Sequence, residues 1–362
     1  MAEDPNVRRA DAMVEGAPAV SVAAAVDRFL DNRIEPQAFG ATRSTPTLNY
    51  LLMSTGGQYG AFGAGFLAGW SQSETDPRPD FDIVTGASAG GILAPVAAAG
   101  PEFDEKLNLI TGKGGADLIR ERGPLGALFS NSLVDISPLE ALIRDQVDTE
   151  LLQALVDRRE AGQTAFVGAV NLDTGAFEVI DLSAIAAEAP KSEAEPCVEE
   201  AILATSAIPA AFPPRFINGV PYSDAGLRDH VFIDQVREGV ANARSRGQRI
   251  RLNAYIIING DLDLEATSVK NSLTGIAQRS AQIVSDAGLR KSILEVLRLD
   301  QETNWSLRAI TARDVVFPQG CDTSTLFEAC VTQALYDAGF EMGSAKKIPW
   351  LSARELRALA QE

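Results

Sequence analysis

A serine flanked by two glycines, in the segment Gly86-Ala87-Ser88-Ala89-Gly90, has the spacing of a nucleophile elbow. In such an elbow the serine lies on a sharp turn from a strand into a helix, and small neighbours let the two backbone segments pass closely. The apolar run 81–85 predicts a buried strand before the turn, and the Ala-rich run to residue 99 predicts a helix after it. We therefore expect Ser88 to be a nucleophile held by Gly86 and Gly90, rather than part of a turn that only packs.

A second glycine cluster, Ser54-Thr55-Gly56-Gly57-Gln58-Tyr59-Gly60, follows a predicted strand (48–54) and precedes a predicted helix (60–70). Consecutive glycines free backbone N–H groups to turn toward an anion. A nucleotide-binding loop would need Gly-x-Gly-x-x-Gly or a Gly-Lys-Ser/Thr ending, and the segment has neither. An oxyanion hole needs only unobstructed amides near a nucleophile. Because Ser88 follows one crossover later, the two clusters together predict acyl transfer rather than phosphate binding.

The residue types alone leave open which base would activate Ser88. A serine hydrolase commonly uses a histidine that an acid orients. The chain has one histidine, His230, with Asp224 and Asp229 close to it in sequence, so a triad is one arrangement. In the alternative, His230 is a loop residue without a catalytic role and a carboxylate acts directly on the serine.

Three other patterns have structural interpretations that we prefer. Residues 112–115 lack the flanking residues of a phosphate loop, so a simple turn is expected. Residues 125–133 are expected to be core between helices rather than a lid over an acyl chain. Asp261, Asp263 and Glu265 do not match a calcium loop and are expected to form a solvated strand end.

Predicted strands and helices alternate along the chain. Besides the elements named above, we expect helices over about 20–30, 195–206, 268–299 and 325–338, strands at 164–170, 176–182, 251–258 and 315–316, and a small hairpin turning at Asn218-Gly219. Strands 164–170 and 176–182 should also form a hairpin. This alternation predicts an α/β fold with a mostly parallel sheet and helices on both faces.

The composition excludes several classes of function. The 362 residues include 32 Lys+Arg and 49 Asp+Glu, a net charge of −17, which argues against nucleic-acid binding and against a global attraction to anionic lipid. A single histidine argues against His-rich metal sites. No apolar run approaches the ~20 residues that a transmembrane helix needs.

The cysteines bear on the compartment. There are three, Cys197, Cys321 and Cys330, without a Cys-x-x-Cys pair. No signal peptide is visible in residues 1–16, and chains of that kind more often carry separate thiols than disulfides. The spacing of Cys321 and Cys330 is nevertheless compatible with a disulfide. The expectation is a cytoplasmic protein if the sequence is complete, or an exported one if it was trimmed and these two cysteines are bridged.

Four motifs in order give the chain a family resemblance. They are the glycine-rich run 56–65, the elbow 86–90, the segment Ser-Ala-Ile-Pro-Ala-Ala-Phe-Pro-Pro at 206–214, and Asp224-Ala225-Gly226. Together they resemble the patatin-like phospholipases in their bacterial form, over roughly residues 48–240. This resemblance divides the chain into an N-terminal extension (1–46), a catalytic domain (47–240) and a C-terminal α/β part (241–362) expected to pack on the same core.

The resemblance implies a fold and a mechanism. The fold would be a three-layer α/β/α sandwich around a mostly parallel sheet. Ser88 and Asp224 would form a catalytic dyad, and amides of Gly56, Gly57 and Gln58 would form the oxyanion hole. The chain would then be a lipid acyl hydrolase of the phospholipase A or lipase type, which requires no metal or organic cofactor. Its substrate would be a lipid or acyl ester, met in transient contact with a membrane surface.

Two residues depart from the family pattern. Thr55 stands where the family usually has a further glycine, and Ala225 stands where glycine is usual in the loop that carries Asp224 and Gly226. The Cβ of Ala225 is the more serious departure, because it would bear on the position of that loop.

Two alternatives remain: an esterase, thioesterase or acyltransferase with the same dyad, and a catalytically silent lipid-binding or interaction module with the same fold.

Overall fold

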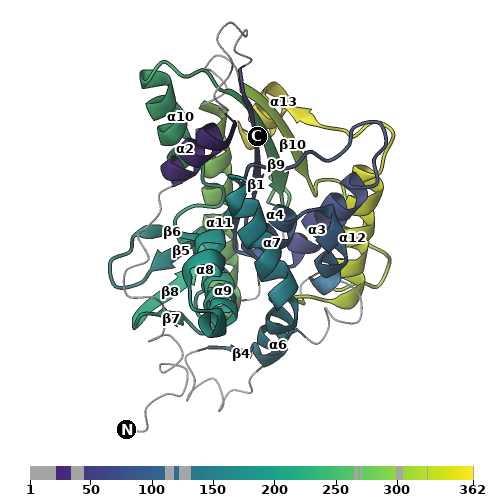
Figure 1. Ribbon diagram of the computed structural model, residues 1–362. Helices are drawn as coiled ribbons and strands as arrows, with labels where there is room; N and C mark the ends of the chain where they lie inside the picture. The colour runs from purple at the N-terminus through teal and green to yellow at the C-terminus, as the bar shows by residue number, and fades with distance from the viewer. Residues whose placement is uncertain are drawn as a thin grey trace, which may run out of the picture.

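The computed structural model describes residues 22–33, 45–110, 118–121, 132–264, 268–269, 271–298, 305–323 and 325–361 (Figure 1). Within these residues, nine strands form one sheet whose centre is parallel. The parallel strands are, in spatial order, β10 (Trp305–Thr311), β9 (Arg251–Ile258), β1 (Thr47–Met53), β2 (Ile83–Ala87) and β5 (Thr164–Asn171).

Antiparallel strands complete both edges of the sheet. At one edge β11 (Leu351–Ser352) pairs with β10. At the other edge, β5 pairs with β6 (Phe177–Asp181) and with β8 (Val220–Asp224), and β8 pairs with β7 (Arg215–Ile217). Separately, β3 (Arg120–Glu121) pairs with β4 (Val134–Asp135).

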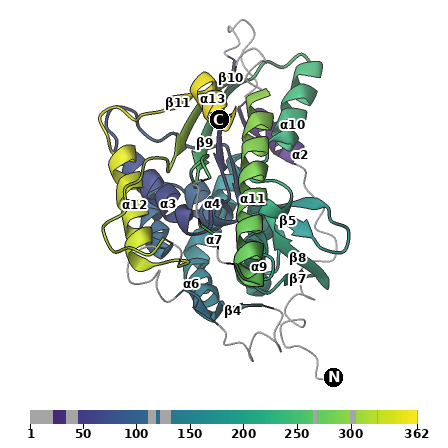
Figure 2. The same cartoon turned by 180° about the vertical axis from the view of Figure 1, so that it is seen from behind.

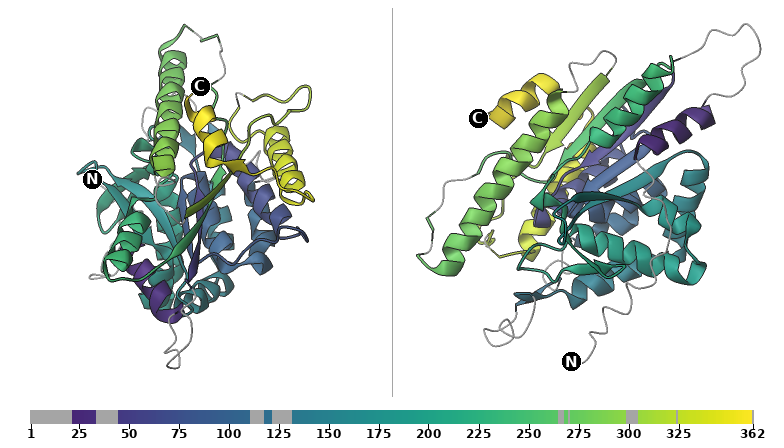
Figure 3. Two further views of the ribbon diagram at one scale, coloured as in Figure 1. Left: turned by 90° about the horizontal axis from the view of Figure 1, so that it is seen from above. Right: turned by 90° about the vertical axis from the view of Figure 1, so that its left-hand side faces the viewer.

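Helices cover both faces of the sheet (Figure 3). The larger apolar core contains residues of α3 (Gly60–Trp70), α4 (Ala89–Ala99), η2 (Pro101–Ile110), α6 (Ser137–Gln146), α7 (Thr149–Glu160), α8 (Leu182–Glu188), α9 (Lys191–Thr205) and α12 (Ala329–Gly343). The opposite core contains residues of α2 (Val22–Arg33), α10 (Asp234–Ser245), α11 (Leu273–Arg298) and α13 (Ala353–Gln361). The expected three-layer α/β/α sandwich is confirmed.

Side-chain alternation along the central strands explains the two cores. In β1, Leu51 and Met53 belong to the larger core, whereas Tyr50 and Leu52 belong to the opposite one. Successive side chains of a strand point to opposite faces, so a strand covered on both sides reads as a continuous apolar run. The run 48–54 was recognisable as a strand for this reason.

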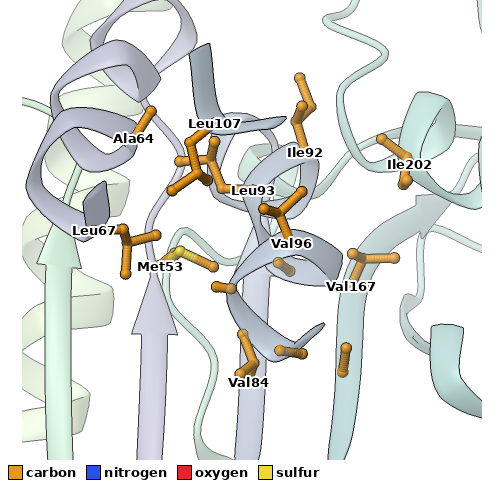
Figure 4. Close-up of a cluster of buried hydrophobic side chains, with 14 of the residues drawn as sticks. Met53, Ala64, Leu67, Val84, Ile92, Leu93, Val96, Leu107, Val167 and Ile202 are labelled. Atoms are coloured by element: carbon orange, nitrogen blue, oxygen red, sulfur yellow. The ribbon is translucent and has the colours of Figure 1, made fainter. Parts of the chain in front are cut away.

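Helix α4 packs firmly over the sheet, which fixes the turn that precedes it. Figure 4 shows Leu93 and Val96 of α4 among Met53, Val84 and Val167 of the strands, all part of one buried cluster. Cores at native density resist displacement of a single methylene. The turn between β2 and α4 therefore joins two elements that are held rigidly.

Two glycines of α3 allow this helix to approach α12 closely. A Cβ on Gly65 or Gly69 would lie 2.0 or 2.2 Å from the carbonyl oxygens of Tyr336 or Phe340 in α12. The backbones of α3 and α12 thus touch, and Figure 1 shows the two helices side by side. Only residues without a Cβ permit such an approach.

Most predicted elements agree with the structure, with shifted ends. The predicted turn at Asn218-Gly219 is confirmed, with φ of 51° and 76° at its two residues, between β7 and β8. The predicted strand 315–316 is wrong: these residues form a loop after β10, a strand that was not predicted. None of the described helices is long and apolar enough to cross a membrane.

Cys321 and Cys330 form a disulfide, so the expectation of separate thiols is wrong for these two residues. Cys197 is a free, buried thiol. The bridge closes the segment that leads into α12, whose first amides are capped by Glu328: its carboxylate accepts hydrogen bonds from the N–H groups of Cys330 (2.7 Å) and Val331 (3.0 Å). The disulfide therefore fixes the start of a helix that packs along α3.

Reduction of this disulfide is expected to destabilise the protein. The cysteines are 9 positions apart, and opening a loop of that size lowers the free energy of unfolding by about 2–3 kcal/mol through the added freedom of the unfolded chain. Thermal unfolding with and without reductant measures the effect, and a Cys321→Ser/Cys330→Ser variant should be insensitive to reductant. The prediction would be contradicted by three alkylatable thiols in the unreduced chain together with equal midpoints of thermal unfolding with and without reductant.

Candidate active site

Strands β2 and β8 meet end to end along one edge of β5. Residues of β5 pair with β6 on one side, so β2 and β8 must share the other side. The last residue of β2, Ala87, lies opposite Gly168, and the last residue of β8, Asp224, lies opposite the next residue, Ala169. This register brings Asp224 to the turn that carries Ser88.

Ser88 occupies a strained backbone position between β2 and α4. Its φ of 51° and ψ of −119° are uncommon for a residue with a side chain. The elbow glycines are both required: a Cβ on Gly86 would lie 2.2 Å from the carbonyl oxygen of Gly90, and one on Gly90 would lie 2.5 Å from that of Met53. The Ser88 N–H donates to Oγ1 of Thr205, the last residue of α9, at 3.0 Å. These contacts hold the turn in place.

Ser88 and Asp224 are directly hydrogen-bonded. The Ser88 Oγ donates to Asp224 Oδ2 at 2.6 Å, and the two residues are only 5% and 6% exposed. The other carboxylate oxygen, Oδ1, accepts the N–H of Gly226 at 2.7 Å, and the Asp224 N–H donates to the carbonyl of Ala207 at 2.9 Å. The carboxylate is thus oriented at both oxygens with one edge toward the serine.

Burial changes the acidity of Asp224. Loss of solvation penalises the charged form and raises the pKa of Asp224 to about 6, while the hydrogen bonds from Ser88 and Gly226 act in the opposite direction. At neutral pH the group is still mostly ionised. It is therefore a stronger base than an exposed aspartate, whose pKa lies near 3.9.

The side chain of Ala225, the residue after Asp224, is accommodated in the core. Its side chain is fully buried and packs with Ala87 and Phe232. It begins η4 (Ala225–Leu227), the turn whose second residue, Gly226, hydrogen-bonds the aspartate. The departure from the family pattern at this position is accommodated by packing.

The glycine cluster forms a short helix beside Ser88. Residues Gly57–Tyr59 form η1, and the first N–H groups of a helix have no acceptor within it. Gly57 has a φ of 54° and lines the same pocket as Ser88. The side chain of Gln58 has a separate contact: its Oε1 accepts the N–H of Phe327 at 2.8 Å.

Asn259, directly after β9, supports this glycine cluster. Its Nδ2 donates to the carbonyl of Ser54 and its N–H donates to the Ser54 Oγ, both at 2.8 Å. A Cβ on Gly56 would lie only 1.8 Å from the Asn259 carbonyl oxygen. The position of Gly56 is thus set by a residue about 200 positions away. No local sequence pattern predicts this contact.

His230 does not lie between Ser88 and Asp224, which are hydrogen-bonded directly, and its ring contacts Thr55 instead. Its Nδ1 is 2.5 Å from Thr55 Oγ1, and its N–H donates to Ser292 Oγ at 3.1 Å. Asp229 accepts from the same Ser292 hydroxyl at 2.6 Å. Burial lowers the pKa of His230 to about 4, so the ring is neutral at pH 7. Thr55, the other departure from the family pattern, thus anchors the histidine.

An apolar pocket opens beside the Ser88 hydroxyl. Most of its walls are apolar side chains that come from separate parts of the chain. The pocket is lined by Gly57, Ser88, Ala89, Ile92, Leu118, Leu139, Ser206, Ile208, Phe212 and Phe327. Ile208 and Phe212 belong to the Pro-rich motif 206–214, whereas Phe327 comes from the disulfide-closed segment and had no signal in the sequence.

The other described candidates have interaction partners of their own. Asp261 accepts the N–H of Asp263 at 3.0 Å, and Asp263 is paired with Arg290 (3.6 Å) and Arg313 (3.4 Å), so this strand end is partly neutralised. Among the described residues, Cys321, Glu328 and Cys330 are close enough for a metal site, but the two sulfurs are bonded to each other. Glu265, residues 112–115 and residues 125–131 lie outside the described part of the chain.

The comparison with known families agrees with this geometry. Residues 51–237, slightly more than half of the chain, match the family model of the patatin-like phospholipases. The match includes the elbow, the glycine cluster, the Pro-rich motif 206–214 and Asp224. No curated protein matches the chain. The chain belongs to the patatin-like phospholipase family.

Proposed function

We propose that this protein is a lipid acyl hydrolase of the phospholipase A or lipase type, with Ser88 as nucleophile and Asp224 as general base. The observation that carries the proposal is the 2.6 Å hydrogen bond between the two buried side chains. The strained elbow at Ser88 and the family membership support it.

The reaction would proceed through an acyl-serine. Asp224 takes the hydroxyl proton while Ser88 Oγ attacks the ester carbonyl, and the amides of Gly56, Gly57 and Gln58 donate to the oxyanion. Collapse of the tetrahedral intermediate expels the alcohol, which takes the proton from Asp224. Asp224 next takes a proton from water, whose oxygen attacks the acyl-Ser88 ester. Collapse of this second intermediate releases the fatty acid, and the Ser88 Oγ takes the proton back from Asp224. No cofactor is needed for these steps.

The pocket supports an acyl chain as the group transferred. Leu118, Leu139, Ile208, Phe212 and Phe327 present apolar surface next to the nucleophile. Burial of a methylene in such surroundings contributes about 0.8 kcal/mol. A carbonyl held at Ser88 would therefore direct its hydrocarbon side into this pocket and its alcohol side away from it.

We also propose that 47–240 is the catalytic unit and that 241–362 is needed to complete it, with 1–46 as an extension. Two observations support the dependence on the C-terminal part. Strand β9 lies between β1 and β10 in the centre of the sheet, and Asn259 and Phe327 both contact the glycine cluster.

Release of free fatty acid tests the proposed activity. The protein is incubated with dispersed phosphatidylcholine and with a short-chain nitrophenyl ester, and the products are measured by mass spectrometry and absorbance. We expect release from both substrates and none above background for Ser88→Ala. No release by the folded protein, or equal release by the Ser88→Ala variant, would contradict the proposal.

The proposed base predicts an acid limb in the pH profile. Protonated Asp224 cannot accept the serine proton, so kcat/KM for a neutral ester is expected to fall about tenfold per pH unit below about 6. Because this pKa is raised in the folded state, ionisation of Asp224 costs stability above about pH 6, and that cost disappears as the pH falls toward 4. Rates measured between about pH 4.5 and pH 8 decide it. A kcat/KM that stays constant down to about pH 4.5 would contradict Asp224 as the base.

A further inference from the structure

The first half of α11 exposes apolar side chains on one side. Leu273, Ile276, Ile283 and Val284 are 86%, 51%, 49% and 71% exposed. At 100° per residue they fall within an arc of about 100° on the helix surface. Large side chains exposed singly are ordinary, but a continuous stripe of them marks an interaction surface.

This stripe faces away from the body of the protein. In the second half of α11 the buried residues are Leu289, Ile293, Val296 and Leu297, and they pack in the core beneath the helix. By the same helical count they lie roughly opposite the exposed stripe. The apolar side of α11 therefore changes from outward to inward along the helix, so the exposed stripe is not a continuation of the core contact.

The exposed half also projects from the fold at the end where Ser88 lies. Helix α11 connects the parallel strands β9 and β10, so it runs against the strands and begins at their carboxyl ends. Figure 2 shows it along the sheet, and the right-hand view of Figure 3 shows one end extending beyond the other elements. Its middle packs behind the site: a Cβ on Gly288 would lie 2.6 Å from His230 Nε2.

Leu227 adds apolar surface between the helix and the dyad. It is the last residue of η4, three positions after Asp224, and it is 48% exposed. The outward stripe of α11 and Leu227 thus lie at the same end of the molecule as the site. An apolar surface that met this end would meet the dyad region as well.

The charge around the stripe is unlike that of the rest of the chain. No Asp or Glu occurs between Glu265 and Asp286, and the only charged residues there are Lys270 and Arg279. The whole chain has 49 acidic residues and a net charge of −17. The first part of α11, up to residue 285, therefore places no carboxylate of its own against lipid headgroup phosphates and acyl chains, where charge is costly.

We propose that residues 271–285, here called the α11 arm, insert their apolar stripe into the surface of a zwitterionic lipid aggregate and so bring the Ser88 end of the molecule to its substrate. This inference rests on the proposed function, since it names the form in which the lipid is met. An amphipathic helix of this kind lies in the interface with its apolar side buried in the acyl boundary. The net negative charge of the chain favours neutral over anionic lipid surfaces.

Sedimentation with phosphatidylcholine vesicles tests the arm. The variant Leu273→Glu/Val284→Glu places two carboxylates on the stripe, and Gln282→Glu/Ser285→Glu places two on the opposite side of the same helix. All four positions are exposed, so both variants should fold, which circular dichroism and thermal unfolding verify. We expect the stripe variant to bind vesicles about tenfold more weakly or worse, and the control to bind within about twofold of wild type.

The alternative occupant of the stripe is a second copy of the chain. Light scattering of the wild type and the stripe variant identifies it. A wild-type dimer that the stripe variant converts to monomer, with vesicle binding unchanged, would overturn the proposal. So would equal binding by the two double variants, or a wild-type protein that does not bind vesicles.

The Ser88→Ala variant separates the arm from the chemistry. It is expected to bind phosphatidylcholine vesicles as the wild type does. Vesicle binding without any ester hydrolysis would overturn the proposed function and leave the arm in place. Hydrolysis of dissolved esters without vesicle binding would overturn the arm and leave the proposed function in place.

Discussion

Asp224→Asn is expected to lower kcat/KM for a short-chain ester by about 10²-fold or more, the usual scale for loss of a general base. The amide oxygen of asparagine can still accept the N–H of Gly226, with its Nδ2 then beside the Ser88 Oγ, but the side chain cannot take the serine proton. Because the ionised carboxylate is buried at a cost, the variant should remain folded. Steady-state kinetics with one dissolved ester, together with thermal unfolding, measures both effects.

The matched control for this prediction is His230→Asn. An asparagine can keep a polar atom where His230 Nδ1 meets Thr55 Oγ1, so the packing behind the site is preserved. Its kcat/KM is expected to stay within several-fold of wild type. A collapse of activity in His230→Asn, with nearly normal activity in Asp224→Asn, would restore the triad and remove the dyad.

Gly56→Ala is expected to destabilise the protein by about 3 kcal/mol or to prevent folding. The new Cβ would lie 1.8 Å from the backbone carbonyl oxygen of Asn259, and the preceding strand β1 is paired with β9 along its whole length. Neither backbone can retreat without breaking the centre of the sheet. Denaturant unfolding of purified protein, or the soluble yield if none can be purified, gives the result.

The neighbouring glycine provides the comparison. A Cβ on Gly57 would meet nothing within 4 Å, but its φ of 54° is unfavourable for alanine. Gly57→Ala should therefore cost only about 1 kcal/mol, and the protein should remain folded. Equal losses of stability in Gly56→Ala and Gly57→Ala would contradict this account, because they would show that the close approach of Gly56 to Asn259 is not the reason that position 56 needs glycine.

The parts of the site with local signals were predictable from the sequence. The small residues that the turn requires predict the elbow at Ser88. Helix 60–70 and strand 251–258 have their predicted bounds. The family resemblance is confirmed over residues 51–237. The order of the motifs also pointed to Asp224, although its distance from Ser88 depends on how β2 and β8 share an edge of β5.

Features that depend on distant contacts were not predictable. Asn259 and Phe327 reach the glycine cluster only because β9 and the disulfide-closed segment fold against it. Strand β10 was missed because its first half is only partly buried, which leaves a weak apolar pattern. The sequence predicts a helix over most of α11. That its apolar side chains face solvent in the first half and the core in the second can be seen only once the position of the core is known.

Labelling with a fluorophosphonate is the most direct test of Ser88 as an activated nucleophile. Such a reagent phosphonylates a serine whose hydroxyl is activated by a base beside an oxyanion hole. We predict one added group per folded chain, located at Ser88 by peptide mass spectrometry. It should be absent from Ser88→Ala and from unfolded wild type, and form far more slowly in Asp224→Asn. A folded wild-type protein that takes up no label, or a Ser88→Ala variant that takes up as much as wild type, would contradict the account.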